Sequence, residues 1–355
     1  MDFAIELATA ADSWKVAKRA EELGFHSAWF EDSQMVAADP FVAMAAAAMQ
    51  TSRIRLGTGV CVPTNRIPPV TANMLATLNA LAPGRIDWGV GTGFSARRAM
   101  GLGAISVDTL SRHLRAVRGL LARDTVEWDF GAGRRRKIRF LNPEVPLFNT
   151  TDPVRTHVAA MGPRTRELAA ELGCHWITLF MSQDQVRAEM AAMDAAYRAA
   201  GRAPEDHRKL AFTFGAVLRD GESCATPRVR AQAGPLAAMV LHNLMEADAG
   251  DLGTGNVEDD ALVAAYRALY RDYQPADARY LTLHRGHALF MRPEEDAVLP
   301  AEFIRKSTFT GTVKQLAEQV KGIADAGYSE ISFVVLPQYP DAVEDWARVM
   351  EAARV

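Results

Sequence analysis

Residues 53–93, RIRLGTGVCVPTNRIPPVTANMLATLNALAPGRIDWGVGTG, decide the fold. The run 54–60 is short and rich in aliphatic residues, which is typical of a buried strand. Pro68 and Pro69 then begin a helix with apolar residues at helical spacing, and Pro83–Gly84 ends it. The run 86–91 predicts a second strand. Because a helix joins the two strands, we expect them to be parallel, with both glycine-rich turns at the same end.

The same alternation extends through the rest of the chain. Short apolar runs at 3–7, 26–32, 156–161, 175–180, 209–218 and 329–336 predict six more strands, with helical patterns between them. Eight strands alternating with helices indicate a (β/α)8 TIM barrel. A doubly wound sheet with a dinucleotide site is the main alternative, but the turn after the first strand, ATAADSW, contains no glycine. We therefore predict a barrel.

Two further segments lie outside the simple repeat. TVEWDF and RKIRFL, near residues 125–141, flank a glycine-rich turn and predict a surface hairpin whose arginines form a basic cluster. Residues 220–306 contain two helical patterns and little strand signal, between the seventh and eighth strands. A connection of this length predicts a helical insertion that acts as a lid or a subunit contact. The prediction is a single domain over 1–355.

Composition restricts the functional class. The 355 residues are 49% hydrophobic and 23% charged, with a net charge of -3, which favours neither nucleic acid nor an anionic membrane as a partner. Three widely spaced cysteines indicate neither a disulfide framework nor a zinc motif. The N-terminus is not a signal peptide, and no apolar run is long enough to span a membrane. We expect a soluble, cytoplasmic protein.

In a TIM barrel the active site lies at the C-terminal ends of the strands. The turn AAMGPRT opens a helix at Gly162–Pro163, and its free N–H groups with the Thr165 hydroxyl would suit a cofactor phosphate, although the same residues could simply cap the helix. Gly311–Thr312 is a weaker candidate of the same kind. Arg97 follows the fourth strand and could meet an anionic group, although a surface role is equally compatible with its position.

His284 and His287 form H-x-x-H within the insertion. One of them could donate a proton to a substrate or contact it, and the alternative is a pair of satisfied polar residues beneath a lid. The sequence shows no further ligands nearby, so no metal site is expected.

Four segments together resemble the bacterial-luciferase-like superfamily of flavin and deazaflavin oxidoreductases, in particular its methylenetetrahydromethanopterin-reductase-like branch. They are WFEDSQMVAADPF, the stretch TSRIRLGTGV to GVGTGF, VAAMGPRTRELAAELG and FTGTVKQLAEQVKGIADAG. The resemblance covers nearly the whole barrel and leaves 220–306 as the poorly matched part. It implies a barrel that binds either FMN or coenzyme F420, the 8-hydroxy-5-deazaflavin.

The resemblance also implies site residues. A non-prolyl cis peptide at Gly59–Val60 would press against the flavin ring, with Asp32 close to it. The catalytic candidates are Asp32, His284 and His287, and Ser33 and Arg97 are candidates for binding substrate. The cofactor-binding candidates are Asp32, Gly59, Val60, Thr92, Phe94, Met161, Gly162, Pro163 and Thr165.

Departures from the family pattern narrow the activity. Deazaflavin-dependent sugar-phosphate dehydrogenases carry His and Glu at the places where this chain has Ser33 and Phe94, so that chemistry is not expected. Cys174–His175 replaces the usual Asp-Gly before the sixth strand, and we expect this change to alter the phosphate end of the site. Asp32 and the insertion histidines are then the only evident ionisable candidates, so the cofactor would carry the chemistry.

Three functions follow from these observations. The first is hydride transfer between a deazaflavin and a small organic substrate. The second is a two-component monooxygenase that receives reduced FMN from a separate reductase, because the chain lacks a nicotinamide site. The third is a non-catalytic flavin-binding homologue. Arg97, Arg98 and the basic hairpin could meet the acidic tail of a deazaflavin, which favours the first. We expect a homodimer or a higher homo-oligomer.

Overall fold

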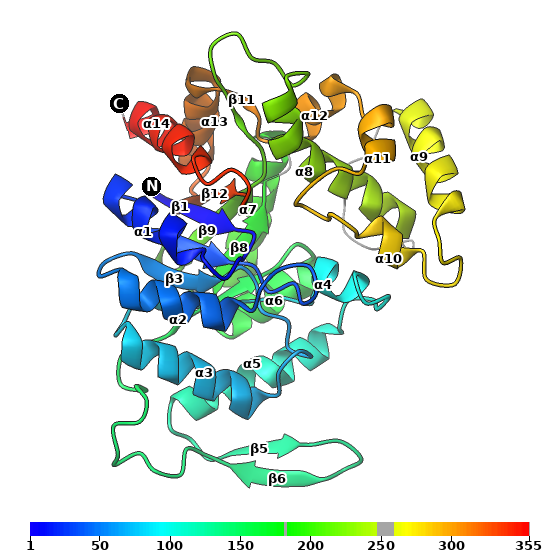
Figure 1. Cartoon of the computed structure of the whole chain (residues 1–355). Coiled ribbons are helices and arrows are strands. Elements are labelled where there is room, and N and C mark those ends of the chain that lie inside the picture. Colours follow the sequence, from blue (N-terminus) through cyan, green and yellow to red (C-terminus); the bar gives the residue numbers. More distant parts are fainter. Residues whose placement is uncertain (181–182, 247–258, 355) are drawn as a thin grey trace.

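The computed structural model describes residues 1–180, 183–246 and 259–354. Eight parallel strands form a closed barrel in the order β1-β12-β9-β8-β7-β4-β3-β2 (Figure 1). The strands are β1 (Asp2–Leu7), β2 (Ser27–Phe30), β3 (Arg55–Thr58), β4 (Ile86–Val90), β7 (Arg155–Ala159), β8 (His175–Leu179), β9 (Lys209–Thr213) and β12 (Glu330–Val335). The predicted TIM barrel is confirmed.

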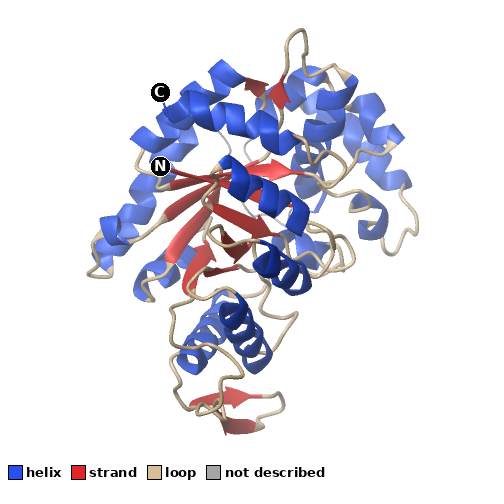
Figure 2. Ribbon diagram, turned by 60° about the vertical axis from the view of Figure 1, so that its left-hand side comes forward, coloured by secondary structure: helices blue, strands red, loops and turns tan. Residues whose placement is uncertain are grey.

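Helices surround the barrel (Figure 2). They are α1 (Trp14–Leu23), α2 (Pro40–Gln50), α3 (Pro68–Leu81), α4 (Phe94–Arg98), α5 (Val107–Leu121), α6 (Pro163–Glu171), α7 (Gln183–Ala199), α13 (Val313–Asp325) and α14 (Ala342–Arg354). A short 3-10 helix, η1 (Pro204–Asp206), precedes β9. Helix α3 begins at Pro68 as predicted. Proline suits the first turn of a helix because it has no N–H group that would need a hydrogen-bond acceptor there. The main hydrophobic core lies between the strands and these helices.

Large side chains fill the interior of the barrel itself. Trp29, Ile177, Leu210 and Phe212 form a cluster there with Ala4. The centre is so full that a Cβ atom added to Gly57 would lie 2.5 Å from the Trp29 ring. Gly57 therefore serves internal packing, and the glycines of residues 53–93 are not all part of a ligand site.

The run 209–218 is not one strand as predicted. It divides into β9 and a short β10 (Val217–Leu218), which leaves the barrel and pairs with β11 (Gly311–Thr312). Gly215 lies at the exit, where an added Cβ would be 2.1 Å from the backbone oxygen of Phe309. This close backbone contact, which periodicity does not reveal, diverts the chain into the insertion.

The insertion contains α8 (Pro227–Glu246), α9 (Asp260–Asp272), α10 (Tyr280–Leu283), α11 (Pro293–Val298) and α12 (Ala301–Ser307). Its helices share a separate hydrophobic cluster. Leu236 of α8 and the turn residues Ala288 and Leu289 pack against Ala8 and Val334, which lie beyond or near the C-terminal ends of β1 and β12. On the other side, the Tyr280 ring packs over Gly101 after α4. The insertion thus contacts the rim of the barrel mouth from two sides, as a lid does (Figure 1).

The predicted hairpin is formed by β5 (Val126–Asp129) and β6 (Arg135–Ile138), which pair antiparallel. It follows the C-terminal end of α5 and precedes the N-terminal end of β7, and it projects away from the barrel in both overall views. Its arginines therefore do not line the mouth, and the suggestion that they meet a cofactor tail loses its basis.

Candidate active site

Two glutamates lie at the floor of the barrel mouth. Because side chains alternate along a strand, Glu6 points to the same side as Ala4, which is part of the interior cluster with Trp29. Glu6 is also the register partner of Trp29. Glu31 directly follows β2, and its backbone nitrogen donates to the carbonyl of Leu7, the last residue of β1, at 3.1 Å. Its charge acts on Glu6, so the two carboxyl groups lie near each other at the mouth.

Burial and nearby negative charge raise the pKa of both glutamates. Burial, and then the charge of Glu31, raise the pKa of Glu6 well above its usual 4.5. Burial also raises the pKa of Glu31, with a smaller contribution from Asp32, while a hydrogen bond with Ser33 opposes the shift. Within the described residues, Oε2 of Glu6 is buried without a hydrogen-bond partner. The pair is therefore suited to hold a proton and to release it to, or take it from, a bound molecule.

Asp32 is engaged in an ion pair. Its Oδ2 atom lies 2.8 Å from Nη1 of Arg66 and 3.3 Å from the backbone nitrogen of Val62. Arg66 also donates to Asp39 at 2.6 Å. These bonds fasten the loop after β3 to the end of β2. Asp32 is therefore placed to position this loop, and its expected catalytic role stays a prediction.

The loops after β3 and β4 are joined by Arg97. Its Nη1 atom donates to Oγ1 of Thr64 at 2.8 Å and its Nε atom to the carbonyl oxygen of Gly103 at 2.5 Å. The guanidinium of Arg98 lies 3.9 Å from the centre of the Phe94 ring, a cation–π contact. Thr92, half-buried, accepts a bond from the Ile105 nitrogen. The predicted substrate contact of Arg97 would have to coexist with its two loop bonds.

The predicted cis peptide at Gly59–Val60 is confirmed. The Gly59 nitrogen donates to the Phe30 carbonyl at 2.7 Å, and the Val60 side chain belongs to the partly buried set around the interior cluster. An added Cβ at Gly91 would lie 3.1 Å from Val60. Gly91, directly after β4, thus makes room for the apolar Val60 side chain.

Helix α6 begins beside the end of β7 and has an open N-terminus. Gly162 occupies its N-cap position and no side chain caps it. The Thr165 hydroxyl donates to the Gly162 carbonyl at 2.9 Å, and Met161 accepts a bond from Arg166. Pro163 is exposed at the first turn. Free N–H groups and the helix dipole make this end suitable for an anion, and the expected cofactor phosphate there stays a prediction.

The weaker phosphate candidate is different. Thr312 caps α13 and forms a reciprocal capping box with Gln315, whose Oε1 atom accepts from the Thr312 nitrogen at 2.9 Å. Because its own side chains occupy the donors of this helix start, α6 is the better phosphate site of the two.

His284 and His287 lie inside the insertion, both buried. Among the described residues, their side chains form hydrogen bonds with other residues of the insertion, which include His242 of α8. The expectation that no further ligand-type residue lies near H-x-x-H is wrong, because α8 brings His242 into the same group of possible metal ligands. Burial lowers the pKa of His242 and of His287, although the Glu295 carboxylate opposes the shift in both.

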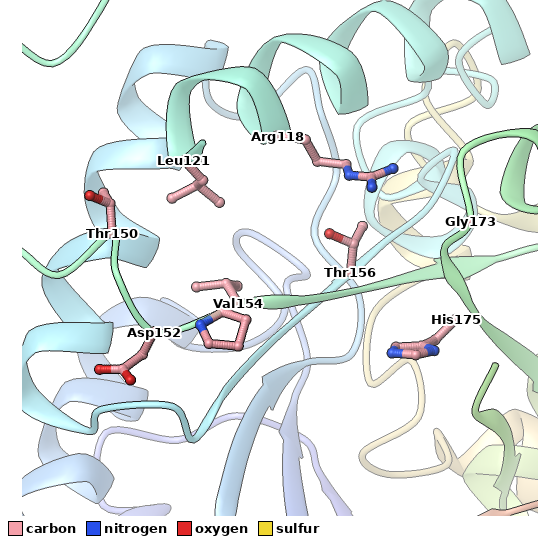
Figure 3. Close-up of a pocket in the computed structure, with 9 residues that line it drawn as sticks. Arg118, Leu121, Thr150, Asp152, Val154, Thr156, Gly173 and His175 are labelled. Carbon is pink, nitrogen blue, oxygen red and sulfur yellow. The ribbon is translucent and has the colours of Figure 1, made fainter. Parts of the chain in front are cut away.

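A separate hollow of about 230 Å³ lies at the opposite end of the barrel. It is lined by residues from α5 and from the N-terminal ends of β7 and β8, and Figure 3 shows Arg118 and Leu121 above Thr156 and Val154. Active sites of TIM barrels occupy the other end. We therefore place the candidate site at the mouth and not in this hollow.

Sequence reasoning missed two of these residues. Glu6 is an acid in the run FAIEL, and the alternation of that strand places it with the inward residues, which is a signal that could have been used. No comparable signal existed for His242, since it is separated by 42 residues from His284 and belongs to a different helix.

The chain matches the family model of luciferase-like monooxygenases over residues 6–330. A 5,10-methylenetetrahydromethanopterin reductase of Methanolobus tindarius is 29% identical over 230 residues, 62% of this chain and 67% of that protein. An F420-dependent hydroxymycolic acid dehydrogenase of Mycobacterium tuberculosis is 30% identical over 221 residues, 59% of each protein. An F420-dependent glucose-6-phosphate dehydrogenase of Beutenbergia cavernae is 36% identical over 168 residues, 43% of this chain and 48% of that protein. The chain thus spans between about half and two thirds of these relatives.

Solved structures share the fold over the full length. An F420-dependent secondary alcohol dehydrogenase superposes with a TM-score of 0.71 at 18% identity, covering 100% of this chain and 99% of that one. The F420-dependent tetrahydromethanopterin reductase of Methanopyrus kandleri gives 0.72 at 17% identity, with coverages of 98% and 97%. The FMN-bound 3,6-diketocamphane monooxygenase component of Pseudomonas putida gives 0.63 at 17% identity, with coverages of 99% and 96%.

Proposed function

Since the chain belongs to the luciferase-like monooxygenase family, we propose that it is an oxidoreductase that transfers a hydride between coenzyme F420 and a small organic substrate. The observation that carries this proposal is the pair of neighbouring carboxyl groups at the mouth, the buried Glu6 and the partly buried Glu31. Dehydrogenation of an alcohol releases a hydride and a proton, so a residue must take the proton. The names of the similar F420-dependent dehydrogenases support the choice of cofactor.

The residues at the mouth fit such a cofactor. The uncapped start of α6 would hold its phosphate, and a side chain added at Gly162 meets nothing closer than 3.9 Å, so the approach is open. Val60 would face the ring. When bound, the deazaflavin would exchange the hydride with the substrate carbon.

In this proposal, residues of the protein accept and donate the proton that accompanies the hydride. In the direction of oxidation, the substrate O–H bond breaks and the proton passes to an ionised carboxylate of the Glu6–Glu31 pair. In the direction of reduction, the protonated carboxyl group returns it to the carbonyl oxygen. The raised pKa of each carboxyl group favours its protonated form, which suits the pair to accept and return a proton. Asp32 and Arg66 position the loop that carries Val60, and the lid would exclude water.

Fluorescence titration with coenzyme F420, FMN and reduced FMN tests the proposal. We expect F420 to bind in the micromolar range, where binding is worth about 8 kcal/mol, and secondary alcohols to bleach the bound cofactor. Preference for reduced FMN, with oxygen consumption, would support the two-component monooxygenase and a separate reductase instead. Binding of none of the three would contradict any flavin-dependent activity.

The proposal includes a cytoplasmic homodimer. Cys61, Cys174 and Cys224 are all free and buried, which suits a reducing compartment. Val42 and Met49 are 69% and 67% exposed on one face of α2, seven residues apart, where a second copy could cover them. No described helix has the length and apolar character required to cross a membrane.

A further inference from the structure

Three buried histidines converge inside the insertion. His242 comes from α8, while His284 and His287 come from the turn after α10, where the His287 nitrogen donates to the His284 carbonyl at 3.1 Å. Each offers a ring nitrogen within 4.8 Å of those of the other two. The Nδ1 atom of His287 lies 3.1 Å from Nδ1 of His242 and 3.3 Å from Nδ1 of His284. Three identical atoms therefore face one another.

Carboxylates hold the outer ring nitrogens of two of the three histidines, whereas Nε2 of His287 is buried without a hydrogen-bond partner among the described residues. Nε2 of His242 lies 2.8 Å from Oε1 of Glu295, and Nε2 of His284 lies 2.9 Å from Oε2 of Glu246. A carboxylate oxygen accepts, so both Nε2 atoms carry the proton, and in a neutral ring the Nδ1 atom is then a lone pair. Two lone pairs consequently point at His287.

His287 alone cannot donate a hydrogen bond to the Nδ1 lone pairs of both His242 and His284. Its Nδ1 atom has one proton at most and can make one good hydrogen bond, which leaves the other buried lone pair without a donor. A cation among the three atoms would satisfy all of them. Nitrogen ligands about 2.1 Å from a tetrahedral zinc ion lie roughly 3.4 Å apart, close to the two observed separations.

The surroundings also suit a cation. Glu295 is fixed by Arg292, whose Nη2 atom lies 2.6 Å from Oε1, and by the Tyr266 hydroxyl at 2.5 Å from the same oxygen. Carboxylates that orient metal-bound imidazoles in this way are typical of zinc sites. Two carboxylates against one arginine leave a net negative charge around three neutral rings, which a divalent ion would offset.

We propose that His242, His284 and His287 bind one divalent transition-metal ion of the zinc type through their Nδ1 atoms. The ion would tie the turn 284–289 to α8. Because Ala288 and Leu289 in this turn pack against the barrel mouth, the site would hold the lid in place over it. The site stands on its own residues and does not depend on the proposed cofactor.

The test uses the untagged full-length protein, stripped with a chelator and then titrated with Co²⁺ and Zn²⁺. We expect one ion per chain by elemental analysis, visible absorption from tetrahedral Co²⁺, and a higher melting temperature with either ion. His242→Asn and His287→Asn should lose the ion. Glu246→Gln keeps all three ligands and should lower the affinity ten- to a hundredfold. His26→Gln, far from the cluster, is the matched control and should bind as the wild type does.

Two results would overturn the proposal. If the stripped wild type takes up no Co²⁺ or Zn²⁺, the histidines form only a hydrogen-bonded group. If His242→Asn and His287→Asn bind as much ion as the wild type, the ion lies elsewhere. If circular dichroism shows that the histidine variants do not fold, two measurements still test the proposal. They are the affinity of Glu246→Gln for the ion and the Co²⁺ absorption spectrum of the wild type. Unchanged affinity in Glu246→Gln, or a spectrum that is not tetrahedral, would contradict the proposed site.

Discussion

Glu6 shows how one residue inside a strand couples stability to pH. Its pKa is raised in the folded protein, so above pH 4.5 the unfolded chain releases a proton that the folded chain keeps. The folded state therefore loses stability as the pH rises from 4.5 toward the raised pKa, by at most about 1.4 kcal/mol per pH unit. A neutral side chain of the same shape removes this loss.

We accordingly predict that Glu6→Gln is increasingly more stable than the wild type as the pH rises above 4.5. Thermal melts over a pH series measure the difference, with exposed Glu205→Gln as the control, whose difference should not change with pH. The same substitution should remove most of the dehydrogenase activity while F420 still binds. A stability difference between Glu6→Gln and the wild type that is constant over the pH series would contradict a raised pKa of Glu6 in the folded protein.

Gly162 permits a test that separates charge from shape. Its φ of -100° is open to any residue, and an added Cβ atom would meet nothing closer than Oγ1 of Thr165 at 3.9 Å. Asp and Asn both cap helices well, so each should keep or raise the melting temperature. We expect Gly162→Asp to abolish binding of F420 by repelling its phosphate and Gly162→Asn to weaken it only modestly, as measured by fluorescence titration. Equal affinities in the two variants would exclude a phosphate at α6.

At the scale of elements, a buried ion pair between Arg55 and Asp87 links the neighbouring strands β3 and β4. Arg55 Nε and Nη2 lie 2.7 and 2.8 Å from the two carboxylate oxygens of Asp87. Burial alone would raise the pKa of Asp87, but His157, whose Nε2 atom lies 3.6 Å from Oδ1, and the two bonds from Arg55 hold this pKa well below its usual range. Each of the two buried charges, on Arg55 and on Asp87, is therefore stabilised by the other.

We predict that Arg55→Ala lowers the free energy of unfolding by about 3–5 kcal/mol, because it leaves a buried carboxylate without its partner. Urea unfolding measures the change. Exposed Arg53→Ala, two residues away, should change it by less than about 0.5 kcal/mol. The double variant Arg55→Met with Asp87→Asn should recover much of the loss, and a double variant as unstable as the sum of the two single variants would show that the pair is not coupled.

Elements also show what sequence reasoning captured. The helix 68–81 and the strands around it followed from proline positions and apolar spacing, which are local. The division of 209–218 into β9 and β10 depended on the Gly215–Phe309 contact between segments far apart in the chain. The Gly59–Val60 bond was correctly expected, but only through the family resemblance.

At the scale of the whole molecule, the proposed dimer should depend on the exposed face of α2. We predict that Val42→Glu raises the dimer dissociation constant at least tenfold, because it places a charge within an apolar contact. Light scattering after size exclusion measures the mass. Leu141→Glu, at a residue that is 78% exposed beyond β6, should leave the mass unchanged. A monomeric wild type would contradict the dimer itself.

The sequence by itself determined the barrel and the position of the insertion, and it predicted the end of the barrel at which the candidate site lies. These follow from periodicity, from proline and glycine positions and from the rule that parallel strands end together. The extent of the single domain stays a prediction. Only the tertiary structure brought Glu6 beside Glu31, tied Asp32 to Arg66 and placed His242 against His284 and His287. The acidity of a carboxyl group and the ligand set of an ion depend on neighbours in space, and these come from different strands and helices whose approach no local pattern records.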